Sequence, residues 1–83
     1  MMAACADGKL IAIHLSSQPK FWEGTLRAID RLDLGNDERF KTREARIQNY
    51  VELTQALAVA FATKPRVEWM KLLEAEDVPF APV

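Results

Sequence analysis

Residues 10–29 read LIAIHLSSQPKFWEGTLRAI, and this stretch predicts a β-strand followed directly by a helix. Its first part, LIAIHLS at 10–16, is short and rich in β-branched residues, and a turn signal, ADGK at 6–9, precedes it. These features are typical of a strand. Because side chains alternate along a strand and both sets are mostly apolar here, we expect cover on two sides.

The second part of the stretch has the pattern of a helix. Ser17 is a suitable N-cap, and Pro19 is tolerated in a first turn. Apolar side chains then recur at helical spacing, namely Phe21, Trp22, Leu26 and Ile29. We expect this helix to end near Arg31, before a polar loop over residues 33–40 that contains Gly35 and Asn36.

Further helices follow the loop. Thr42 can cap a short helical turn through Ile47, and NYVE at 49–52 has the form of a capping box that favours a break before a second helix. That helix would bury Tyr50, Leu53, Leu57 and Phe61. Residues 63–77 repeat the pattern, with Thr63 as cap, Pro65 in the first turn, and an apolar line of Val67, Met70 and Leu73 widened by Trp69 and Leu72.

The sequence therefore predicts one small domain over residues 1–83, of the α+β class and mostly helical, with one N-terminal strand followed by three to four helices. A lone strand leaves its backbone N–H and C=O groups unpaired. We expect its neighbours in missing chain or in another copy. The prolines of VPFAPV at 78–83 end the last helix and predict an extended connection to further chain.

Composition excludes several classes of function. The net charge of −1, with acids and bases interspersed, gives no field to attract nucleic acid or an anionic membrane. No apolar run approaches the roughly 20 residues of a membrane span. A single cysteine cannot close an internal disulfide and is consistent with a reducing compartment, so we expect a cytoplasmic protein. One Cys and one His supply too few ligands for zinc.

Few side chains are candidates for chemistry. Cys5 and His14 form a nucleophile pair only if they meet with a third, orienting group. His14 is more typical of a core or edge residue, and Ser16 and Ser17 of strand termination and capping. The carboxylates Glu23, Asp30 and Asp33 lie on or beside a solvated helix face, where no apolar pocket would raise a pKa.

A small basic cluster, made by Lys41, Arg43 and Arg46, can approach a phosphate, but ion pairs with Asp37, Glu38 and Glu44 explain it better. Trp22 and Trp69 fit a core. We therefore assign no catalytic, cofactor-binding or metal-binding residue.

Three segments in register resemble one family. The first is DGKLIAIHLSSQPKFWEGTLRAI, with a turn, a strand and a helix near a Trp. The second, DLGNDERFKTREARIQNYVELTQAL, contains D-x-R-F-x-T-x-x-x-R-x-x-N. The third, FATKPRVEWMKLLEAEDVPFAPV, has a Thr-led helix with E-W, closed by V-P-x-x-P-V. Together they resemble the family III CoA-transferases, which include formyl-CoA transferase, carnitine CoA-transferase and alpha-methylacyl-CoA racemase.

The resemblance implies that residues 7–83 are the small domain of a longer enzyme whose Rossmann-like large domain carries the catalytic aspartate. No catalytic residue is therefore transferred to this chain. The matched positions look structural, and they are Asp37, Arg39, Phe40, Thr42, Arg46, Asn49, Trp69, Pro79, Pro82 and Val83. The departures are Asp30, where Gly is frequent, Leu32, where Pro is frequent, and Phe80, where a small residue or Cys is common.

The resemblance also implies a function. The longer enzyme would move CoA between carboxylic acids or epimerise an acyl-CoA, with a coenzyme A thioester as its substrate. This chain would cover the acyl-CoA cleft, contact the large domain within a homo-oligomer, and be inactive alone. Two alternatives remain: a stand-alone helical protein–protein interaction module, and a cysteine hydrolase that uses Cys5 and His14.

Overall fold

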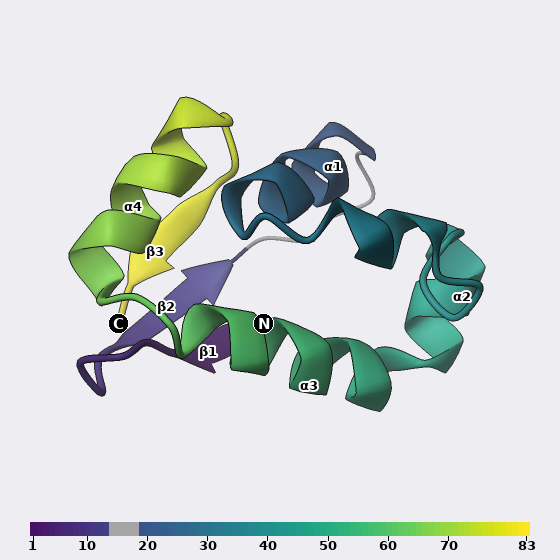
Figure 1. Cartoon of the computed structure of the whole chain (residues 1–83), viewed down its shortest axis with the longest axis horizontal. Helices are drawn as coiled ribbons and strands as arrows, with labels where there is room; N and C mark the ends of the chain where they lie inside the picture. The colour runs from purple at the N-terminus through teal and green to yellow at the C-terminus, as the bar shows by residue number, and fades with distance from the viewer. Residues whose placement is uncertain (14–18) are drawn as a thin grey trace.

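Helices cover one face of a small antiparallel sheet in the computed structural model (Figure 1). The structure describes residues 1–13 and 19–83. Its elements in chain order are β1 (Met2–Ala4), β2 (Leu10–Ile13), α1 (Pro19–Ala28), the 3-10 helix η1 (Leu32–Asn36), α2 (Arg43–Gln48), α3 (Tyr50–Phe61), α4 (Arg66–Ala75) and β3 (Phe80–Pro82). The predicted class, α+β and mostly helical, is confirmed.

The sheet corrects the prediction of a single strand. Within the described residues it has three strands in the order β1-β2-β3, so β2 is central and both of its edges are paired. Ala3 lies opposite Ile11 on one side, and Ala81 lies opposite Ala12 on the other. The backbone of the predicted strand did need partners, but the two ends of this same chain supply them, so the expectation that its neighbours lie outside was wrong.

The two faces of the sheet differ. Ala3, Ile11 and Ile13 are buried against the helices. Leu10 on the opposite face is 38% exposed, and Ala12 is only half-buried. The expectation of cover on both sides was therefore wrong for the described part of the strand, because the helical core lies on the side of Ile11 and Ile13.

Helix α1 is described from Pro19, and the cap predicted at Ser17 lies outside the described residues; the helix ends at Ala28, earlier than expected. Asp30 adopts a φ of 56°, while the Arg31 N–H donates to the Leu26 carbonyl and the Asp30 N–H to the Arg27 carbonyl. This is the Schellman arrangement, whose left-handed position usually holds glycine. Asp77 ends α4 in the same way at a φ of 57°.

The chain breaks between α2 and α3, as the internal polar residues predicted. Thr42 caps α2, because its hydroxyl accepts from the Ala45 N–H at 3.1 Å. The predicted capping box at Asn49 was wrong: the Asn49 side chain accepts no bond from α3 and instead donates to two carbonyls.

Burial on α3 and α4 follows only part of the predicted stripes. Leu53, Leu57 and Phe61 are buried, but Tyr50 is 51% exposed, since the helix turns its first residue away from the core. On α4 the buried pair is Trp69 and Leu73, and the predicted core position of Val67 is wrong (57% exposed).

The cap predicted at Thr63 is also wrong. Pro65 occupies the N-cap position of α4 with no side-chain bond, and the Thr63 hydroxyl donates to the Ala60 carbonyl of the preceding helix. The core between sheet and helices centres on Trp69, Phe40, Phe61, Ile11, Leu57 and Leu73. None of the described helices is long and apolar enough to cross a bilayer.

Candidate functional site

Cys5 lies in the hydrophobic core. Its side chain is 5% exposed, and its backbone N–H donates to the Lys9 carbonyl at 2.9 Å. Burial raises the pKa of the Cys5 thiol, and nearby Asp7 raises it further, with Arg66 opposing. A raised pKa disfavours the nucleophilic thiolate. His14, the predicted partner of Cys5 in a nucleophile pair, and Ser16 and Ser17, predicted to end the strand and cap the helix, lie outside the described residues.

Among the candidate carboxylates, Asp33 forms an exposed ion pair. Asp33 accepts from the Arg31 Nε and Nη2 atoms, both at 3.0 Å, and this bonding lowers the pKa of Asp33. Glu23 and Asp30 are exposed on and just beyond α1. In the part of the chain that the structure describes, each carboxyl pKa with a resolved shift is lowered, which is opposite to what a general acid needs.

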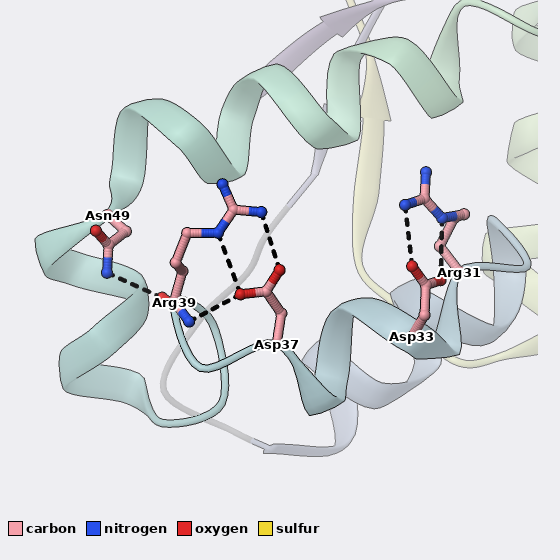
Figure 2. Close-up of polar contacts among 5 residues, drawn as sticks. All are labelled: Arg31, Asp33, Asp37, Arg39 and Asn49. Atoms are coloured by element: carbon pink, nitrogen blue, oxygen red, sulfur yellow. Dashed lines mark hydrogen bonds and ion pairs between the residues drawn. The ribbon is translucent and has the colours of Figure 1, made fainter.

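The D-x-R-F segment forms a self-contained turn between η1 and α2 (Figure 2). The Asp37 carboxylate accepts from the Arg39 backbone N–H at 2.9 Å, from Nε at 3.1 Å and from Nη2 at 2.9 Å. Asn49 closes the turn from the end of α2, because its Nδ2 donates to the carbonyls of Arg39 at 3.1 Å and Ala45 at 3.0 Å.

Phe40 and Arg46 attach this turn to the core. The Phe40 ring is fully buried, and its carbonyl accepts from the Arg46 Nη1 at 3.0 Å. The Arg46 guanidinium lies 4.7 Å from the ring centroid of Trp22 on α1, a distance typical of a cation–π contact. The polar motif positions therefore bond the backbone of their own turn, which explains their spacing structurally.

The predicted ion-pair network exists only in part. Lys41 Nζ lies 3.8 Å from Glu38, but Arg46 bonds a carbonyl and a ring instead of an acid. Burial lowers the pKa of Arg46, and Arg43 nearby lowers it further. Within residues 1–13 and 19–83, no three metal-ligating side chains gather.

Asp37 provides a pH-dependent prediction. Bonding to Arg39 lowers the pKa of Asp37 in the folded state. The ionised Asp37 therefore stabilises the fold at pH values above its unfolded-state pKa of about 3.9, and this stabilisation is lost as the pH falls through its lower folded-state pKa. We expect Asp37→Asn to narrow the difference in urea midpoint between about pH 6 and about pH 2.5.

Arg39→Gln supplies the control for that experiment. If the Asp37–Arg39 pair causes the pH dependence of the urea midpoint, Asp37→Asn should change that dependence much less in the Arg39→Gln variant than in the original chain. Equal changes in both backgrounds would contradict the role of the pair.

The outer face of the sheet is the remaining candidate surface. An open hollow of roughly 470 Å³ lies where the end of β2 meets β3, and its lining is mostly apolar: Met1, Ala12, Ile13, Pro79, Phe80 and Ala81. Sequence reasoning missed this surface because it did not recognise β1 and β3. The available signal was the apolar composition of both chain ends, MMAAC and VPFAPV.

A comparison with models of protein families identifies the family of this chain. The family model described as CoA-transferase family III matches residues 2–83, nearly the whole chain. This chain belongs to CoA-transferase family III. The resemblance inferred from the three sequence motifs is thereby confirmed.

Individual members of family III agree with this assignment. The chain is 44% identical over 73 residues to the probable fatty acyl-CoA transferase Rv3272 of Mycobacterium tuberculosis, covering 88% of this chain and 18% of that protein. It is 28% identical over 76 residues to the (R)-2-hydroxy-4-methylpentanoate CoA-transferase of Clostridioides difficile, covering 92% and 19%. A crystal structure of Rv3272 superposes with a TM-score of 0.84 at 34% identity over 98% of this chain and 22% of that one.

The shared length is small for these family III proteins. The chain spans about a fifth of the curated relatives and of the solved structure that it matches. Its matched residues include the turn of Asp37, Arg39 and Asn49, whose polar groups bond the local backbone.

Proposed function

We propose that residues 1–83 form the small domain of a family III CoA-transferase-like enzyme and cover its acyl-CoA cleft. The match of the family model over residues 2–83 carries this proposal. The relatives are named as CoA-transferases, and each is about five times longer than the shared region. The longer enzyme moves CoA between carboxylic acids or epimerises an acyl-CoA, and a coenzyme A thioester is its substrate.

The relatives' names favour transfer over epimerisation. The mycobacterial protein is named a probable fatty acyl-CoA transferase, and the clostridial one a 2-hydroxy-4-methylpentanoate CoA-transferase. The family resemblance implies two partners, namely a Rossmann-like large domain and a second copy of the enzyme. We place this assembly in the cytoplasm. This chain contributes a scaffold to that assembly and no reacting group.

The isolated chain should be inactive as a CoA-transferase. Bonding to arginine lowers the pKa values of the Asp33 and Asp37 carboxyls, and burial raises the pKa of the Cys5 thiol. We expect no CoA transfer above background when the purified chain is incubated with acyl-CoA donors and free carboxylic acids. Rv3272 assayed with the same donors and acceptors provides the comparison. Turnover by the isolated chain would contradict the assignment of catalysis to other polypeptide.

A second candidate function is a stand-alone interaction module. Exposed apolar side chains on and beside α3 favour it, because Ile47, Val51 and Val59 are each more than half exposed. Such a module should stay monomeric at high concentration, whereas a domain lacking its usual cover should self-associate. Sedimentation velocity across a concentration series separates the two functions.

A further inference from the structure

Among the residues that the structure describes, the outer face of the sheet carries only apolar side chains. Residues directly opposite one another in an antiparallel sheet share a face, so the register places Met2 with Ala12 and Ala81, and Leu10 with Ala4. Val83, whose N–H donates to the Leu10 carbonyl, extends this row. The face therefore consists of Met2, Ala4, Leu10, Ala12, Ala81 and Val83, and we call it the outer sheet face.

A solvated sheet face normally carries polar side chains in alternation with the buried ones. Here the alternation is absent, although the side chains are open: Met2 is 63% exposed, Val83 61% and Leu10 38%. An open hollow at the end of this face is lined partly by Ala12 and Ala81, and it also reaches Ile13 and Phe80, which the register places on the inner side of the sheet. An apolar surface that joins an open hollow is typical of a binding surface.

The placement of the chain ends identifies the occupant. Figure 1 shows both ends of the chain at the sheet, and β1 and β3 flank the central strand. The match to Rv3272 covers 98% of this chain but only 22% of that structure. The relative therefore continues beyond the matched region on at least one side, and whichever side continues, the additional chain leaves from the sheet.

We propose that the outer sheet face is the docking surface for the remaining polypeptide of the longer family III protein. The proposal rests on the proposed function, since it names the partner of this small domain. The position of the chain ends does not support the exposed apolar residues of α3 as the docking surface. Both ends of α3 continue into other described helices of this chain, so additional chain would not leave from α3.

A graft tests the docking surface. Residues 2–83 replace the matching segment of Rv3272, and Ala81→Lys is introduced in the graft and in the isolated chain. Because Ala81 is exposed in the isolated chain, Ala81→Lys should leave its Tm and its far-UV circular dichroism unchanged. In the graft, a charge buried against apolar surface should lower Tm by about 3 °C or more.

Ala75→Lys is the matched control, because Ala75 is also exposed but lies at the end of α4 among charged residues. We expect it to leave Tm unchanged in both proteins. Equal effects of Ala81→Lys and Ala75→Lys in the graft would overturn the proposal. Tm can be measured whether or not the graft transfers CoA, so the two proposals can fail separately. A graft that lacks CoA transfer but shows the Tm difference would contradict the proposed function and still support the docking surface.

A second measurement uses the isolated chain and decides the matter if the graft does not fold. The uncovered face should cause weak self-association that grows with concentration, and Ala81→Lys should abolish it while Ala75→Lys does not. A discrete dimer that persists on dilution would identify a second copy as the occupant and overturn the proposal. Self-association unaffected by Ala81→Lys would overturn it as well.

Discussion

Replacing Trp69 with alanine should lower the free energy of unfolding by about 4 kcal/mol, since this is a large and fully packed side chain. Trp69 is 1% exposed, and its ring meets Phe61 edge to face at 4.8 Å. A domain of 83 residues has a total stability of about 4–12 kcal/mol, so this substitution should remove between about a third and all of it. Urea unfolding followed by circular dichroism measures the loss.

The indole N–H of Trp69 adds a second contribution. It donates to the Phe61 carbonyl at 2.8 Å in the buried core. Phe61 is the last residue of α3, and four residues later stands Pro65, which has no N–H to continue the helical ladder. Trp69 therefore supplies the donor that the proline removes, and it joins α3 to α4.

Two further variants separate the contributions of Trp69. Trp69→Phe keeps most of the apolar surface but leaves the Phe61 carbonyl without this donor, so we expect a loss of about 1–3 kcal/mol. Tyr50→Ala removes a ring that is 51% exposed, and it should change stability by about 0.5 kcal/mol. A Trp69→Phe chain as stable as the original would show that the bond to Phe61 contributes nothing net.

The helices could be predicted from the sequence because their apolar residues recur at a fixed period. Leu53, Leu57 and Phe61 are buried as that period requires. Tyr50 and Val67 fit the same pattern yet are exposed. The periodicity identifies which face of a helix is apolar, but it does not show how far along that face a neighbouring element covers it. The ends of the stripes therefore depend on tertiary packing.

The strands at the two ends could not be predicted from local sequence. Residues Met2–Ala4 and Phe80–Pro82 contain no β-branched residue, and Pro82 argues against a central strand. Each is only three residues long and lies at a sheet edge, where its partner β2 determines the structure. The outer sheet face depends on this pairing, so it could not be recognised before the register was known.

Asn49 shows how a local signal is overruled. Its spacing from Glu52 is typical of a capping box, yet its amide donates to Arg39 ten residues earlier and to Ala45. One side chain serves the turn of Asp37 and Arg39 instead of its own helix. The motif resemblance located these residues, but only the structure shows which groups they bond.

Gly24→Val should be the second most damaging substitution, with an expected loss of about 2–3 kcal/mol from overpacking. Gly24 is buried in the middle of α1, a position where glycine itself weakens a helix by about 1 kcal/mol relative to alanine. It is tolerated because α1 approaches the chain after α4 closely: a Cβ at Gly24 would lie 2.8 Å from Val78 Cγ2 and 3.1 Å from the Glu76 carbonyl oxygen.

A double-mutant cycle with Val78→Ala tests the cause of that loss. Val78 is 3% exposed, and removing its methyl groups opens space for the new side chain while the Glu76 carbonyl stays in place. We expect Gly24→Val to cost at least about 1 kcal/mol less in the Val78→Ala background, a coupling typical of residues in contact. Ala58→Val, at an exposed site of α3, measures the cost of a β-branched residue in a helix alone, about 0.5 kcal/mol. If Gly24→Val costs the same in both backgrounds, the close approach of α1 to Val78 does not explain the glycine, and rigid contact with the Glu76 backbone does.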